Sequence, residues 1–152
     1  MSVPISKLKQ KEIREIISFI DDDGNNQEII IKNISKDQKE EFKDFLKEKV
    51  NLDSTELLIR GNEIVRFFYT KLTDLDIKSE DDIIDILNSP NYILTKVSSV
   101  IGEIITELVY EITLEKKLEM NNMLILLEQQ ECYNQIEEIL NKTNNSDEDN
   151  NQ

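Results

Sequence analysis

The sequence predicts an α+β fold that is mainly α, with an N-terminal β-hairpin packed on a bundle of helices around one long central helix. Two Ile-rich runs flank the turn segment DDDGNN within residues 15–34. A longer stretch, from Ser89 to Leu118, carries apolar residues at steps of three and four, which is typical of one broad helical face. Shorter amphipathic segments with helix-capping residues lie between these two regions.

Residues 15–34 carry the pattern of a β-hairpin. Asp and Asn tolerate turn backbone, and Gly24 adopts a positive φ at little cost. Apolar and polar residues alternate imperfectly in both predicted strands, so both strands are expected to be partly covered on two sides. Because a bare two-stranded hairpin is marginally stable, we expect helices, another strand or another subunit to cover it.

Two helices are predicted between residues 35 and 75. Ser35 and Gln38 form a capping box for the first. Residues 51–60 fit either a short strand or one helical turn, and Gly61 is expected to break the chain before a helix capped by Asn62. The apolar residues of the first helix share one narrow stripe: Phe42, Phe45, Leu46 and Val50.

Three adjacent aromatics, Phe67, Phe68 and Tyr69, lie in the second of these helices. At helical spacing they are typical of a core, and a binding surface is the alternative. A further helix is predicted to follow Ser79, because the acidic residues 80–82 suit the positive end of a helix dipole.

The long helix is expected to begin at Ser89, as N-cap, with Pro90 in its first turn. A single helix from Ser89 to Leu140 would measure about 78 Å, which is too long for a compact monomer. We therefore predict a break near Asn121, with Asn122 capping a final helix. An unbroken helix would instead favour a coiled-coil or intersubunit role. The apolar residues expected to form the central stripe are Ile93, Val97, Val100, Ile101, Ile104, Leu108 and Ile112.

An acidic row repeats every four residues along the same helix. A fourfold step drifts by about 40° each time, so the later acids rotate onto the apolar stripe. Beyond Ile112 the helix is therefore expected either to leave the core or to supercoil. Three interpretations remain open for the row: a solvated face, a docking surface for a basic partner, or a metal-binding carboxylate cluster. The row consists of Glu103, Glu107, Glu111, Glu115 and Glu119.

The most concentrated apolar patch outside the hairpin runs from Met123 to Leu127. It fits a core segment, a self-association surface or a surface for a client protein. Combined with the acidic row, it yields the candidate partner-binding residues, namely Met123, Leu124, Leu127, Glu107, Glu111 and Glu115.

Composition limits the other possibilities. The chain has 152 residues, which predicts a basic N-terminal arm (1–14), one domain (15–140) and a disordered acidic tail (141–152). A net charge of −14 argues against nucleic-acid binding, because phosphates would be repelled. The chain lacks His, and Cys132 is its single cysteine, so no catalytic residues, cofactor or metal site are expected. No apolar run suits a signal peptide or membrane span, and the cytoplasm is the expected location.

Two stretches resemble a known family. ISFIDDDGNNQEIIIKNISKDQKEEF is similar to the start of tail assembly chaperones from contractile-tailed phages and phage-like particles of low-GC Gram-positive bacteria. EIVRFFYTKLTDLDI and DDIIDILNSPNYILTKVSSVIGEIITEL resemble their helical portion, so the resemblance spans roughly residues 17–108.

This resemblance implies a non-enzymatic helper that binds the tape-measure protein and keeps it soluble during tail-tube assembly. The tail-tube protein is a second candidate partner. It would act in the host cytoplasm, with no nucleic acid or membrane as partner. Self-association, a structural role in the finished tail particle and an acidic inhibitor that imitates nucleic acid are the alternatives.

Overall fold

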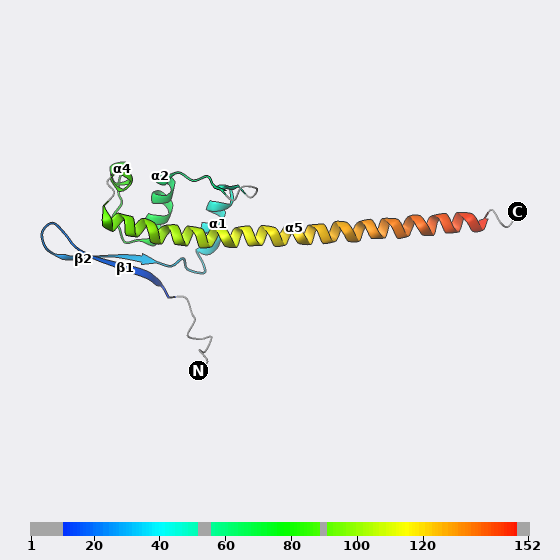
Figure 1. The fold of residues 1–152 in the computed structure, drawn as a ribbon, viewed down its shortest axis with the longest axis horizontal. Helices are drawn as coiled ribbons and strands as arrows, with labels where there is room; N and C mark the ends of the chain where they lie inside the picture. The colour runs from blue at the N-terminus through cyan, green and yellow to red at the C-terminus, as the bar shows by residue number, and fades with distance from the viewer. Residues whose placement is uncertain (1–10, 52–55, 89–90, 149–152) are drawn as a thin grey trace, which may run out of the picture. The chain divides into compact units, whose positions relative to one another are not determined.

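The computed structural model describes residues 11–51, 56–88 and 91–148, and its fold is the predicted one, α+β and mainly helical (Figure 1). The chain divides into two units, Met1–Ile112 and Thr113–Gln152. The first unit holds both small sheets, the shorter helices and the beginning of the long helix α5 (Tyr92–Glu148). In the described part of the chain, the second unit is the rest of α5, residues 113–148.

The N-terminal hairpin is confirmed and begins two residues earlier than expected. Strand β1 (Ile13–Ile20) pairs antiparallel with β2 (Asn26–Lys32). In the turn, Gly24 has a φ of +83°, and its amide donates to the Asp21 carbonyl over 2.9 Å. The Asp21 carboxylate also accepts from the amides of Asp23 and Asn25, which explains why Asp leads this turn.

One face of the hairpin is buried, which resolves the imperfect alternation. Ile17 and Ile29 pair across the strands, and with Ile31 they enter the core. Ile16 and Ile20 lie on the other face and are exposed. The helices of the first unit therefore cover one face of the hairpin.

The first helix is shorter than its apolar stripe suggested. Ser35 and Gln38 exchange the expected capping hydrogen bonds, each 3.3 Å long, and regular helix α1 (Lys39–Lys47) follows. Val50 does not belong to this helix. It starts strand β3 (Val50–Asn51), which pairs with β4 (Glu56–Leu57), so the described part of residues 51–60 contains strand and not a helical turn.

The second helical segment starts at Gly61, one residue before the expected cap. It runs through α2 (Gly61–Ile64), the π-helical turn η2 (Val65–Tyr69) and α3 (Thr70–Leu72). A Cβ on Gly61 would lie 3.0 Å from a Leu87 methyl, so helix α4 (Glu80–Asn88) packs closely there. Phe68 and Tyr69 are buried, as the core interpretation predicted, and half-buried Phe67 stacks on Phe45.

Helix α5 begins at Tyr92 with Asn91 as its cap, because the Asn91 side chain accepts from the Leu94 amide over 2.8 Å. The expected cap Ser89 and Pro90 lie outside the described residues. The predicted central stripe is confirmed, since all its members but the half-buried Ile93 are buried: Val97, Val100, Ile101, Ile104, Leu108 and Ile112.

The predicted break near Asn121 is wrong. Helix α5 is continuous through Asn121 and Asn122, and neither residue caps a new helix. It also continues to Glu148, into the segment expected to be a disordered tail, while residues 149–152 lie outside the described part. Within residues 92–143 of α5 the last buried residue is Ile112, where the drift of the acidic row onto the apolar stripe predicts that the helix either leaves the core or supercoils.

Candidate protein-binding surface

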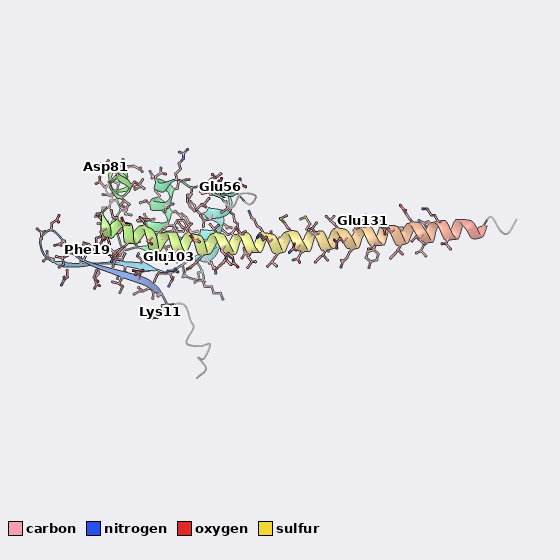
Figure 2. All side chains as sticks on the ribbon, in the orientation of Figure 1. Lys11, Phe19, Glu56, Asp81, Glu103 and Glu131 are labelled. Atoms are coloured by element: carbon pink, nitrogen blue, oxygen red, sulfur yellow. The ribbon has the colours of Figure 1, made fainter. Side chains whose placement is uncertain are left out.

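The first part of the acidic row is bound by an arginine of the hairpin. Arg14 on β1 donates to both carboxylate oxygens of Glu107, over 2.7 and 2.9 Å, and to Glu103 over 3.2 Å. Glu103 projects from α5 on the side of the hairpin (Figure 2). A bidentate contact of this kind fixes both the distance and the orientation of the two side chains, so it holds β1 against α5.

A second ion pair ties helix α1 to α5. The Glu111 carboxylate lies 2.8 Å from the Lys39 ammonium and 3.5 Å from that of Lys43. Lys43 is only 5% exposed, so its charge needs a nearby anion to offset the loss of water. These contacts join residues far apart in the sequence, and Arg14, which falls within the predicted N-terminal arm (1–14), instead belongs to strand β1.

The pKa values follow these contacts. The pKa of Glu107 is lowered mainly by the hydrogen bond from Arg14, and that of Arg14 is raised mainly by the same bond. Both shifts favour the charged pair at neutral pH. Glu103, Glu107 and Glu111 therefore serve contacts within their own unit, and this part of the row is a weak candidate for docking a basic partner.

Among the described residues, exposed large apolar side chains are concentrated in the second unit. Every residue from Lys117 to Thr143 is exposed in the single chain, including the residues around Glu131 in Figure 2. Large apolar side chains are frequent among them, and each keeps more than half of its surface in water: Leu118, Met120, Met123, Leu124, Ile125, Leu126, Leu127, Tyr133, Ile136, Ile139 and Leu140. Patches of this extent on a soluble surface mark interaction sites.

These apolar side chains divide between two faces of the helix. The first, here called the methionine–leucine patch, has the spacing i, i+3, i+4, i+7 of one helical face. Its members are Met120, Met123, Leu124 and Leu127. The second, here called the heptad face, recurs every seven residues. Its members are Leu118, Ile125, Cys132 and Ile139, together with the residues four positions later, Asn122, Gln129 and Ile136. At about 100° per residue the two faces point in nearly opposite directions.

The six predicted partner-binding residues are thus divided between the two units. Met123, Leu124 and Leu127 all lie in the methionine–leucine patch and are 64%, 55% and 61% exposed. Glu107 and Glu111 belong to the first unit and bind the cations described above. Glu115 is an exposed residue of the second unit. The heptad face, including the exposed Cys132, was missed, although its seven-residue repeat was present in the sequence.

Three features of the described residues concern other kinds of site, namely the grouping of metal-ligating side chains, the hydropathy of the helices and the cavity beside Arg14. Within 11–51, 56–88 and 91–148, no three Cys, Asp or Glu side chains are grouped as a metal site would require. Among the helices of that same part of the chain, none has an apolar stretch long enough to cross a membrane. The cavity beside Arg14 and Glu107 measures about 50 Å³, which is room for water and not for a substrate.

No known protein family, curated protein or solved structure matches this chain. The methionine–leucine patch and the heptad face are the two exposed apolar surfaces of the second unit, and any proposal for the function starts from them.

Proposed function

We propose that this protein is a tail assembly chaperone, which binds the tape-measure protein in the host cytoplasm and keeps it soluble while the tail tube assembles. The proposal combines the resemblance of residues 17–108 to that family with one structural observation. That observation is the methionine–leucine patch, whose four side chains are exposed on a helix of the second unit.

The chemistry of this patch suits a helical client. Met side chains are flexible and polarisable, so they adapt to apolar partners of differing shape. A client helix with apolar residues at i, i+3, i+4 and i+7 presents the complementary stripe. Acidic side chains at Glu119, Glu131 and Glu138 border this region and would keep the loaded protein in solution by mutual repulsion.

The alternative of a nucleic-acid mimic receives less support. Such a protein must present a row of free carboxylates spaced like phosphates. Glu103, Glu107 and Glu111 instead bind Arg14, Lys39 and Lys43 of their own chain. A structural component of the tail could use the same apolar surface as a chaperone, and mass spectrometry of purified particles separates the two, since only the component stays in the particle.

The test is co-expression with the tape-measure protein encoded by the same phage or phage-like element. The full chain should move that protein into the soluble fraction and co-purify with it. Combined replacement of Met123, Leu124 and Leu127 by Ser should abolish both effects. The matched control replaces Gln130 and Asn134 by Ser, because these polar residues lie on the same side of the helix as the methionine–leucine patch. The control should still solubilise the client and co-purify with it. Equal solubilisation by both variants would refute the proposal.

A further inference from the structure

The heptad face of α5 points to a second copy of the same helix. In heptad terms, Leu118, Ile125, Cys132 and Ile139 occupy d positions, and Asn122, Gln129 and Ile136 occupy a positions. A shallow concavity on this face is lined by Ile125, Glu128, Gln129, Cys132, Tyr133 and Ile136. Helices gain most of their stability in proteins by packing an apolar face, and the described part of the chain gives residues 117–143 no such packing.

From these observations we infer that the protein self-associates through a parallel, in-register coiled coil formed by the heptad face. The methionine–leucine patch then lies at outer positions of the coiled coil and stays accessible. The inference does not depend on the identity of any client.

Charge distribution favours an identical partner at this face. Between Leu118 and Ile139, the charged residues nearest the seam are Glu119 and Glu128. The other acids of this stretch, Glu131, Glu137 and Glu138, occupy outer positions. Two copies of a strongly acidic chain can therefore meet here with their charges directed away from the contact.

The available area matches that of a stable contact. Apolar side chains at and beside the seam are each more than half exposed, and each would bury on the order of 100 Å². Seven of them give roughly 700 Å² per copy, close to the roughly 800 Å² per partner of a specific interface. They are Leu118, Ile125, Leu126, Tyr133, Ile136, Ile139 and Leu140.

The two amides select the parallel arrangement. In a parallel, in-register pair Asn122 faces Asn122 and Gln129 faces Gln129 of the other copy, so each amide has a hydrogen-bonding partner. With the same overlap, an antiparallel pair would place Asn122 against the Ile136–Ile139 end of the other helix. A buried amide without a partner is destabilising, so the antiparallel pair is disfavoured.

The first test is the solution mass of the full chain, whose monomer mass is 17.8 kDa, by sedimentation equilibrium. We expect at least twice that mass for the wild type. Combined Ile125→Asp and Ile136→Asp should reduce it to the monomer. The matched control, combined Leu124→Asp and Leu127→Asp, carries the same charges on the methionine–leucine patch and should keep the wild-type mass. Near-UV circular dichroism checks that Phe68 and Tyr69 remain packed in each variant.

The second test uses Cys132 as a reporter of register. Under mild oxidation, two thiols at the same d position lose two electrons and two protons to the added oxidant and form one disulfide, which runs as a dimer on a non-reducing gel. A variant combining Cys132→Ser with Gln130→Cys places the thiol at an outer position and should cross-link at least tenfold more slowly. The inference is overturned if the wild type or the Leu124/Leu127 control is monomeric. It is also overturned if the Ile125/Ile136 variant keeps the wild-type mass, or if the two cysteine positions cross-link at the same rate.

Failure of the co-expression test with the tape-measure protein would not change the expected mass or cross-linking, because replacement of Met123, Leu124 and Leu127 leaves the heptad face intact. The two proposals can therefore fail separately.

Discussion

Helix α5 contains two segments of similar apolar content and opposite exposure. Between Tyr92 and Ile112, the apolar stripe is buried against the hairpin and the shorter helices, and Val97 and Ile112 are fully buried. Between Lys117 and Thr143, every residue is exposed. The comparison shows that apolar periodicity specifies a helical face without specifying what that face contacts.

The same contrast holds for charge. In the first segment, Glu107 and Glu111 bind cations carried by β1 and α1. These bonds offset the repulsion between acids four residues apart. Beyond Ile112 the chain supplies few basic residues, with Lys116, Lys117 and Lys142 as the cations up to Thr143. The first segment is therefore stabilised within its chain, whereas the second is suited to contacts with other molecules.

The largest expected effect comes from comparing one leucine in each segment. Leu108→Ala removes a side chain that is 4% exposed and should lower the free energy of unfolding by about 2–5 kcal/mol. Leu127→Ala alters a side chain that is 61% exposed and should change it by less than about 0.5 kcal/mol. Urea unfolding followed by near-UV circular dichroism measures both, and similar losses would remove the distinction between the segments.

A smaller effect is expected from the acids. Glu111→Ala leaves the buried Lys43 ammonium without this carboxylate and should cost about 1–3 kcal/mol, less than a fully buried pair because Glu111 is partly exposed. Glu119→Ala should stay within about 0.5 kcal/mol. Combined Lys43→Met and Glu111→Leu should recover most of the loss, since apolar replacement of a buried pair is often neutral. If this double variant is no more stable than Glu111→Ala, then Glu111 stabilises the fold through a contact other than that with Lys43.

Two asparagines give the next comparison. Asn91→Ala removes the N-cap of α5 and should cost about 1 kcal/mol. Asn121→Ala places a better helix former in a helix interior and should stabilise the helix by up to about 0.7 kcal/mol. Far-UV circular dichroism should show this as an increase in helicity. A lower helicity in the Asn121→Ala variant would instead support the helix break near Asn121 that the sequence predicts.

The smallest effect depends on pH. Arg14→Ala should cost about 0.5–1 kcal/mol at neutral pH, because the Glu107 side chain of the pair is more than half exposed. The pKa of Glu107 is lowered from 4.5 in the folded chain, so the pair contributes fully above about pH 4.5 and is lost as pH falls through the folded value. The difference between wild type and variant should therefore shrink towards pH 3 and in high salt. Lys117→Ala, the control, should show neither trend.

Local patterns predicted much of the fold correctly. The hairpin turn depends on Asp21 and Gly24, and the turn that leads into α1 depends on the exchange between Ser35 and Gln38, all within a few residues of each other. Such contacts are readable because their partners are near in sequence. Val50 was misassigned because its 3.6-residue spacing fits a helix, while pairing with Leu57 placed it in a strand.

The candidate surface was predicted in part. Met123, Leu124 and Leu127 were singled out by their concentration of apolar atoms, and they are exposed together. The ion pairs of Arg14, Lys39 and Lys43 were not foreseen, because they join residues far apart in sequence. The heptad face was missed because the break predicted near Asn121 divided its repeat.

The amino-acid sequence by itself determined the α+β class, the hairpin turn, the apolar stripe of α5 and the end of that stripe near Ile112. Each of these depends on periodicity or on neighbours within a few positions, which a linear sequence displays directly. Folding in three dimensions decided that Arg14 and Lys39 bind the acidic row. That outcome depends on which distant groups meet, which is a property of the folded chain.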